Sequence, residues 1–165
     1  MASIQNVMMK MIEYEAGDPK RIQHFIKVYQ FAKLIAEMEH VDKNTQEIIE
    51  LSALVHDIGI HASEQKYHSS AGNYQELEGS PIAQALLKGL GYSDEVISRV
   101  CWLVGHHHTY HNIQDMDHQI LVEADFLVNA YEDNLTVSAI SDVLSKIFKT
   151  PSGKRLLQTM YLKRD

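Results

Sequence analysis

The chain has 165 residues, and its apolar fraction of 45% and charged fraction of 22% are ordinary for a folded globular domain. These values exclude a disordered, collagen-like or fibrous protein, and the length corresponds to one domain. Acidic residues outnumber Lys and Arg by 22 to 15, which gives a formal charge of −7, so we expect no binding to a nucleic-acid backbone and no membrane partner.

The counts of cysteine and histidine narrow the choice of site chemistry. The chain has 1 cysteine, Cys101, so neither a disulfide framework nor a Cys-rich zinc site is expected. Histidine is unusually frequent, at 10 residues. The sequence contains no apolar run long enough to span a bilayer, and the first twenty residues do not resemble a signal peptide. We therefore expect a cytoplasmic protein.

The spacing of apolar residues is helical throughout and predicts an all-α protein. Helices are expected over residues 3–16, 19–40, 44–58, 81–90, 94–108, 118–133, 137–148 and 152–162. Asp18-Pro19, Ser80-Pro81 and Thr150-Pro151 each combine an N-cap residue with proline, which is typical of a helix start. The sequence thus predicts one helical bundle.

The segment 60–79 lacks a helical pattern and is rich in Ser, Gly, His and Tyr. A loop of this length in a small domain is usually functional, so we expect a lid there. The whole chain, 1–165, is expected to form a single domain. Its core would comprise residues 19–132, between the N-terminal helix 3–16 and accessory helices in 133–165.

The strongest local motif is Leu54-Val55-His56-Asp57-Ile58-Gly59, at the end of an apolar helix. Neighbouring residues of a helix point about 100° apart, so His56 and Asp57 can reach one ion only where the helix opens at its end. The alternative is a solvated helix terminus, at which histidine is favoured by the helix dipole.

A second cluster, Gly105-His106-His107-His108-Thr109-Tyr110-His111, follows the apolar run Val100–Val104. Imidazole is a common ligand of transition metals, and the alternative is an exposed polar helix end. We expect His106 and His107 to be ligands. The remaining histidines of this region, His108, His111 and His118, are expected at the surface or behind the ligands.

Two further residues face apolar surroundings. Asp125 interrupts a helix that is apolar on nearly its whole circumference, and a carboxylate there is costly unless a positive charge compensates it. His24 begins an apolar stripe on the helix 19–40, three residues after Arg21. By itself His24 has the alternative of being a packed core residue.

Together, His24, His56-Asp57 and Asp125 resemble the H…HD…D signature of the HD-domain superfamily of metal-dependent phosphohydrolases, which is carried on a helical bundle. The similarity covers about residues 19–132. It implies that His24, His56, Asp57 and Asp125 hold a divalent metal, and that Asp57 orients the attacking water or bridges two ions.

The resemblance extends in part to the two-metal, HD-GYP-like branches, in which a His-His pair ends a later helix. His106-His107 matches that pair. The intervening histidine of those branches is missing; Glu78 stands near its place, with Glu76 and His68 as alternatives. Ile60 replaces the lysine of the HD-GYP pattern, and no GYP element is present. The sequence leaves open whether one or two ions bind.

A mixed set of imidazoles and carboxylates suits manganese, iron, cobalt, nickel or zinc without selecting one. The metal would bridge an acidic protein and an anionic substrate, which we expect to be a small, nucleotide-like phosphate mono- or diester. Arg21, Lys66 and Arg99 are candidate phosphate ligands, and the lid would contribute His61 or Lys66. The alternatives are a non-catalytic metal- or nucleotide-binding sensor and a helical interaction module; the amphipathic N-terminal helix leaves homo-oligomerisation open.

Overall fold

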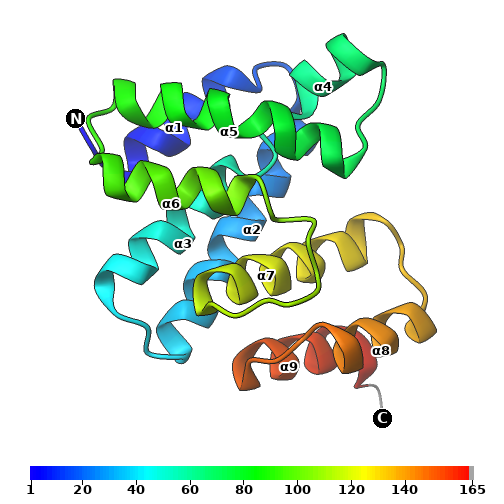
Figure 1. Cartoon of the computed structure of the whole chain (residues 1–165). Helices are drawn as coiled ribbons and strands as arrows, with labels where there is room; N and C mark the ends of the chain where they lie inside the picture. Colours follow the sequence, from blue (N-terminus) through cyan, green and yellow to red (C-terminus); the bar gives the residue numbers. More distant parts are fainter. Residues whose placement is uncertain (164–165) are drawn as a thin grey trace.

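The computed structural model describes residues 1–163, which form nine α-helices and a short π-helix, with no strand among them (Figure 1). The prediction of an all-α fold is confirmed. The elements are α1 (Ile4–Tyr14), α2 (Pro19–Met38), α3 (Lys43–Val55), α4 (Ile60–Tyr67), α5 (Gly72–Gly89), α6 (Asp94–Val104), α7 (Met116–Glu132), α8 (Val137–Lys146), α9 (Pro151–Leu157) and the π-helix η1 (Gln158–Leu162).

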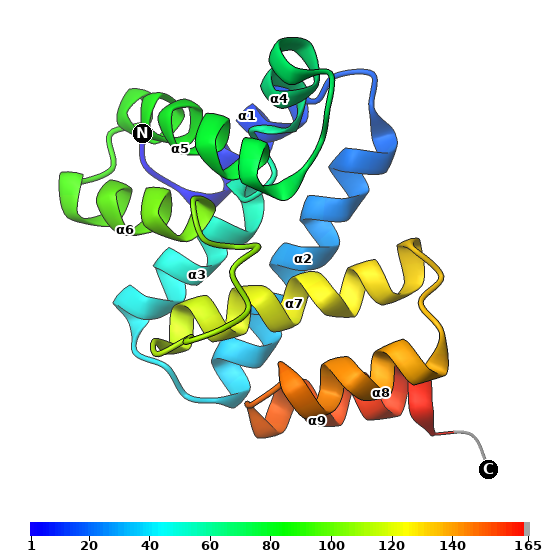
Figure 2. The same cartoon turned by 45° about the vertical axis from the view of Figure 1, so that its right-hand side comes forward.

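Helices α2, α3 and α7 pack against one another and form the centre of the bundle. Helices α5 and α6 pack together beside α3, whereas α8 and α9 lie along the opposite side of α7 (Figure 2). Both α3 and α7 are buried over most of their length, with Ile49, Leu54, Leu121 and Leu127 fully buried. Among the described residues, no helix combines the length and the apolar character needed to cross a bilayer.

Two of the three proline signals mark helix starts as predicted. The side chains of Asp18 and Thr150 cap α2 and α9, accepting hydrogen bonds from the N–H groups of Arg21 and Gly153. Pro81 is different, because it lies inside α5. Ser80 does not cap a helix; its hydroxyl donates to the carbonyl of Cys101 on α6, 2.8 Å away.

The predicted loop over residues 60–79 was wrong, since α4 and the first turns of α5 occupy most of it. Only residues 68–71 connect the two helices, and His68 adopts a left-handed conformation there (φ 53°). Glycine at position 59 lets the backbone before α4 pack directly on α5: a Cβ on Gly59 would lie 2.3 Å from the carbonyl oxygen of Gln75 and 2.6 Å from the nitrogen of Gly79. This contact between distant glycines leaves no trace in local apolar periodicity.

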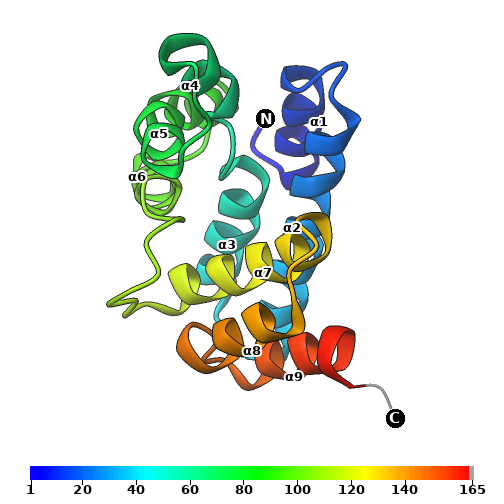
Figure 3. The same ribbon diagram turned by 90° about the vertical axis from the view of Figure 1, so that its right-hand side faces the viewer.

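Helices α3 and α6 both end earlier than predicted. Helix α3 stops at Val55 and α6 at Val104, so His56, Asp57 and the histidines after Gly105 lie in the turns that follow. Helices α2, α3 and α7 meet near the middle of the bundle, and the end of α6 approaches the same region (Figure 3). The segments that carry the histidines therefore converge.

Candidate metal centre

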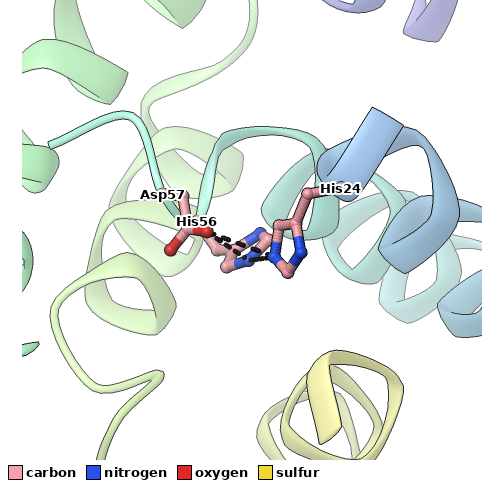
Figure 4. A group of neighbouring side chains, drawn as sticks. All are labelled: His24, His56 and Asp57. Atoms are coloured by element: carbon pink, nitrogen blue, oxygen red, sulfur yellow. Dashed lines mark hydrogen bonds and ion pairs between the residues drawn. The ribbon is translucent and has the colours of Figure 1, made fainter. Parts of the chain in front are cut away.

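The structure brings His24, His56, Asp57 and Asp125 into one cluster. His24 comes from the second turn of α2, His56 and Asp57 from the turn that follows α3, and Asp125 from the middle of α7. The Nε2 atom of His24 lies 3.2 Å from Oδ2 of Asp57 (Figure 4). The same atom lies 3.3 Å from Oδ1 of Asp125. The corresponding distances from Nε2 of His56 are 3.3 and 3.5 Å. The two Nε2 atoms are 3.3 Å apart, so the four side chains aim at one point.

A second group shares Asp57 with the first. Ligand atoms of Asp57, His107 and His108 lie within 4.8 Å of one another, as do those of His24, His56 and Asp57. Oδ2 of Asp57 faces His24 and His56, whereas its other oxygen, Oδ1, lies 3.4 Å from Nε2 of His107. The two oxygens of one carboxylate are thus divided between two clusters of imidazoles.

The hydrogen bonds on the far side of these rings fix which nitrogen faces the cluster. Nδ1 of His56 donates to the carbonyl of Ala53 at 2.8 Å, and Nδ1 of His107 donates to that of Val104 at 2.7 Å. A carbonyl oxygen only accepts, so Nδ1 carries a hydrogen, and Nε2 is the atom that offers a lone pair when the ring is neutral. Nε2 of His107 is buried and has no hydrogen-bond partner among residues 1–163. A metal ion is the group that these inward-facing lone pairs fit.

The carboxylates of Asp57 and Asp125 favour positive charge on the histidines that face them. Burial alone would lower the pKa of His24, but hydrogen bonds with Asp125 and Asp57 outweigh it and raise that pKa to about 10. Burial also lowers the pKa of His56. Attraction to the carboxylate of Asp57 outweighs this effect and raises the pKa of His56 well above its usual value. Burial acts to raise the pKa of Asp57 and Asp125, and the facing imidazoles bring both below the ordinary value. Protons thus compensate the carboxylates where a cation would otherwise do so.

His106, which we expected beside His107, lies outside both groups. Its ring stacks on Trp102 with centroids 4.0 Å apart, and its Nδ1 donates to the carbonyl of Trp102 at 2.7 Å. His108 stands with His107 instead, because the chain turns after α6 and consecutive side chains no longer follow helical spacing. Burial, with help from His107, lowers the pKa of His108 to about 4, which keeps this ring neutral.

Glu78 and Lys66 are not part of the cluster either. Nζ of Lys66 donates to Oε1 of Glu78 at 3.0 Å, and the hydroxyl of Tyr67 donates to the same oxygen at 2.8 Å. Of the two alternatives to Glu78, Glu76 contacts the backbone of the site: its Oε1 accepts a hydrogen bond from the N–H of His108 at 2.9 Å. His68 lies in the link between α4 and α5. The contacts with Lys66 and Tyr67 at the end of α4 thus engage Glu78 outside the cluster.

Arg21 lines an open pocket of about 250 Å³ in front of the cluster, together with Lys20, His24, Asp57 and Asn129. Its guanidinium donates to Oε1 of Glu64 at 2.6 Å and lies 2.9 Å from Nδ1 of His61. Arg99, the third candidate cation, is bound on the other side of the bundle by Asp115 and Asp117. Arg21 is therefore the one of the candidate cations that faces the metal-ligand cluster.

Three supporting residues were missed from the sequence. Glu132 accepts a hydrogen bond from His24, and Gln75 and Tyr110 contact the two ring nitrogens of His108. Glu132 follows Asp125 by seven residues, so helical spacing on α7 places both on one face and could have identified it. No such signal exists for Gln75 and Tyr110, because they reach His108 from different segments.

Comparison with known proteins places the chain in a family. The family model described as "HD domain" matches residues 21–145, and a search of curated proteins found no match. Among solved structures, the chain is similar to a predicted HD superfamily hydrolase from an uncultured Thermotogales bacterium, at 24% identity and a TM-score of 0.66 over 96% of this chain and 83% of that one. The structural similarity bears out the fold, and the family match covers most of the chain, including His24, His56, Asp57, His107 and Asp125. The chain therefore belongs to the HD domain family.

Proposed function

We propose that the protein is a metal-dependent phosphohydrolase that cleaves a phosphate mono- or diester of a small, nucleotide-like molecule. The observation that carries this proposal is the orientation of the imidazoles around Asp57. His56 and His107 have their Nδ1 hydrogens bound to backbone carbonyls, and the Nε2 atom of His107 is buried without a partner. Membership of the HD domain family, whose members are metal-dependent hydrolases, supports the same chemistry.

The division of Asp57 favours two ions over one. His24, His56 and Asp125 would hold the first ion with Asp57, and His107 and His108 would hold the second with Asp57, His108 by exchanging its contact with Gln75 or Tyr110 for the ion. The mixture of imidazoles and carboxylates suits Mn, Fe, Co, Ni or Zn. When bound, such ions supply a water of lowered pKa and neutralise phosphate oxygens.

The chain's own residues would bind and orient the substrate. Glu64 and His61 fix the guanidinium of Arg21 at the pocket, where its free donors can bind a phosphate oxygen. Asp57 would hold the attacking water between the two groups. Asn129, which donates to Oδ1 of Asp125 at 3.0 Å, keeps that carboxylate directed at His24 and His56.

The proposal is tested by measuring hydrolysis of bis(p-nitrophenyl) phosphate, p-nitrophenyl phosphate and a panel of nucleoside monophosphates with protein reloaded with Mn²⁺. The variants are His56→Ala and Asp57→Asn, and His106→Ala is the matched control because His106 lies outside both groups. We expect both cluster variants to lose bound metal and turnover, with the control unchanged.

Two outcomes would contradict the proposal. Turnover that persists in metal-free Asp57→Asn protein would show that hydrolysis does not use this cluster. Tightly bound metal without hydrolysis of any ester in the panel would favour a metal- or nucleotide-binding sensor instead.

A further inference from the structure

The first ion group is supported by a pair of charged residues that the proposed reaction does not itself require. Oε2 of Glu132, in the last turn of α7, accepts a hydrogen bond from Nδ1 of His24 at 2.8 Å. The other oxygen, Oε1, accepts from Nζ of Lys27 at 2.7 Å. The side chain of Glu132 is only 13% exposed, so both of its oxygens are committed in a largely buried setting.

We infer that Glu132 is the positioning residue for His24, and that it sets the affinity of the first ion position. This inference rests on the proposed metal site. It follows from a difference between His24 and the other ligands. His56 and His107 lie at helix ends and bind backbone carbonyls three residues earlier. His24 lies in the second turn of the 20-residue helix α2, where the helix uses its own carbonyls.

The partner that fixes the ring of His24 is therefore a side chain, and it comes from another helix, α7. Asp125 and Glu132 lie two turns apart on α7, so one face of this helix supplies both a ligand and the support of another ligand. A carboxylate that accepts from Nδ1 holds the ring so that Nε2 faces the ion position. It also makes the imidazole more basic, and so a stronger metal ligand, than a carbonyl partner does. Lys27 fixes the second oxygen and so prevents the carboxylate from turning away.

The test compares metal affinity in wild-type protein, Glu132→Ala, Glu132→Gln and the matched control Asp133→Ala. The control removes the same charge from the adjacent, exposed residue. Mn²⁺ binding is measured by equilibrium dialysis with elemental analysis, and melting temperatures are measured in EDTA. We expect the affinity of the first ion to fall about 10- to 100-fold in Glu132→Ala. The fall should be smaller in Glu132→Gln, whose amide oxygen still accepts from Nδ1, and Asp133→Ala should match wild type.

Glu132→Gln keeps the shape of the side chain, so it reports on the ligand even if Glu132→Ala melts at a lower temperature in EDTA. Unchanged Mn²⁺ affinity in both Glu132 variants would overturn the inference. A raised KM with unchanged affinity would also overturn it, because Glu132 would then act on the substrate. Failure of the proposed function looks different: wild-type protein itself would bind no metal or hydrolyse no ester.

Discussion

Two of the buried carboxylates of helix α7, Glu123 and Asp125, are two residues apart and have different partners. Glu123 is fully buried and receives hydrogen bonds from Nε2 of Gln119 (2.5 Å), the N–H groups of Lys149 (3.1 Å) and Thr150 (3.2 Å), and the hydroxyl of Thr150 (2.6 Å). Asp125 accepts one such bond, from Asn129, and otherwise faces the imidazoles of His24 and His56.

The difference shows how a structural acid differs from an acid that we propose as a metal ligand. A buried carboxylate is tolerated when donors satisfy its oxygens, and Glu123 meets that requirement with backbone and side-chain donors. Asp125 instead faces nitrogens whose lone pairs are held inward, so a cation completes its environment. Glu123 ties the start of α9 to α7, whereas Asp125 belongs to the centre of the bundle.

The largest expected effect is that of Asp125→Asn on catalysis. Loss of a metal's charge stabilisation costs several kcal/mol in the transition state, so turnover of the best ester should fall by about 10³-fold. Steady-state kinetics with Mn²⁺-loaded protein and elemental analysis would measure this, with circular dichroism as the check on folding. Wild-type turnover in this variant would show that Asp125 resembles Glu123 in role.

Glu123→Ala should affect stability rather than metal binding. It leaves four donors at the α7–α9 contact without their acceptor, which should lower the free energy of unfolding by about 3 kcal/mol. The melting temperature should then fall by about 6–12 °C. Calorimetry in EDTA measures the change, with Glu37→Ala on the exposed side of α2 as control. A loss of bound Mn²⁺ at unchanged melting temperature would reverse the assignment of the two acids.

His108→Ala and His106→Ala form a matched pair that distinguishes a ligand from its neighbour. Removing His108 should lower the affinity for the second ion about 10- to 100-fold, because the second group then retains only Asp57 and His107. Removing His106, which stacks on Trp102, should leave both ions in place. Equilibrium dialysis over a range of Mn²⁺ concentrations separates the two. An equal loss of Mn²⁺ affinity in the two variants would contradict the assignment of His108, rather than His106, to the second group.

The smallest effects concern the cations. Arg21→Ala should raise KM about tenfold, because the variant loses one charged hydrogen bond to a phosphate oxygen of the substrate. Lys66→Ala should change KM less than about twofold, because exposed ion pairs such as Lys66–Glu78 contribute little. Kinetics with one ester at saturating Mn²⁺ measures both. A larger change for Lys66→Ala would indicate that α4 moves toward the pocket when substrate binds.

The sequence was informative where chemistry is local and less so where two distant segments meet. Apolar periodicity and capped prolines predicted the helical fold, and the H…HD…D residues predicted a cluster that the structure does assemble from α2, α3 and α7. The contact of Gly59 with Gly79 has no signal in the local sequence, which is why the pattern predicts a loop where α4 and the start of α5 form. The choice between His106 and His108 depends on the turn after Val104, whose geometry is set by tertiary packing.

Metal stoichiometry tests most directly whether the imidazoles around Asp57 are oriented to hold two metal ions. Purified wild-type protein and Asp57→Asn are dialysed to equilibrium against Mn²⁺ and analysed for metal per chain. We expect two ions per wild-type chain and a loss at both positions in Asp57→Asn, because this residue alone belongs to both groups. Equal metal content in the two proteins, or none in wild type, would contradict the account.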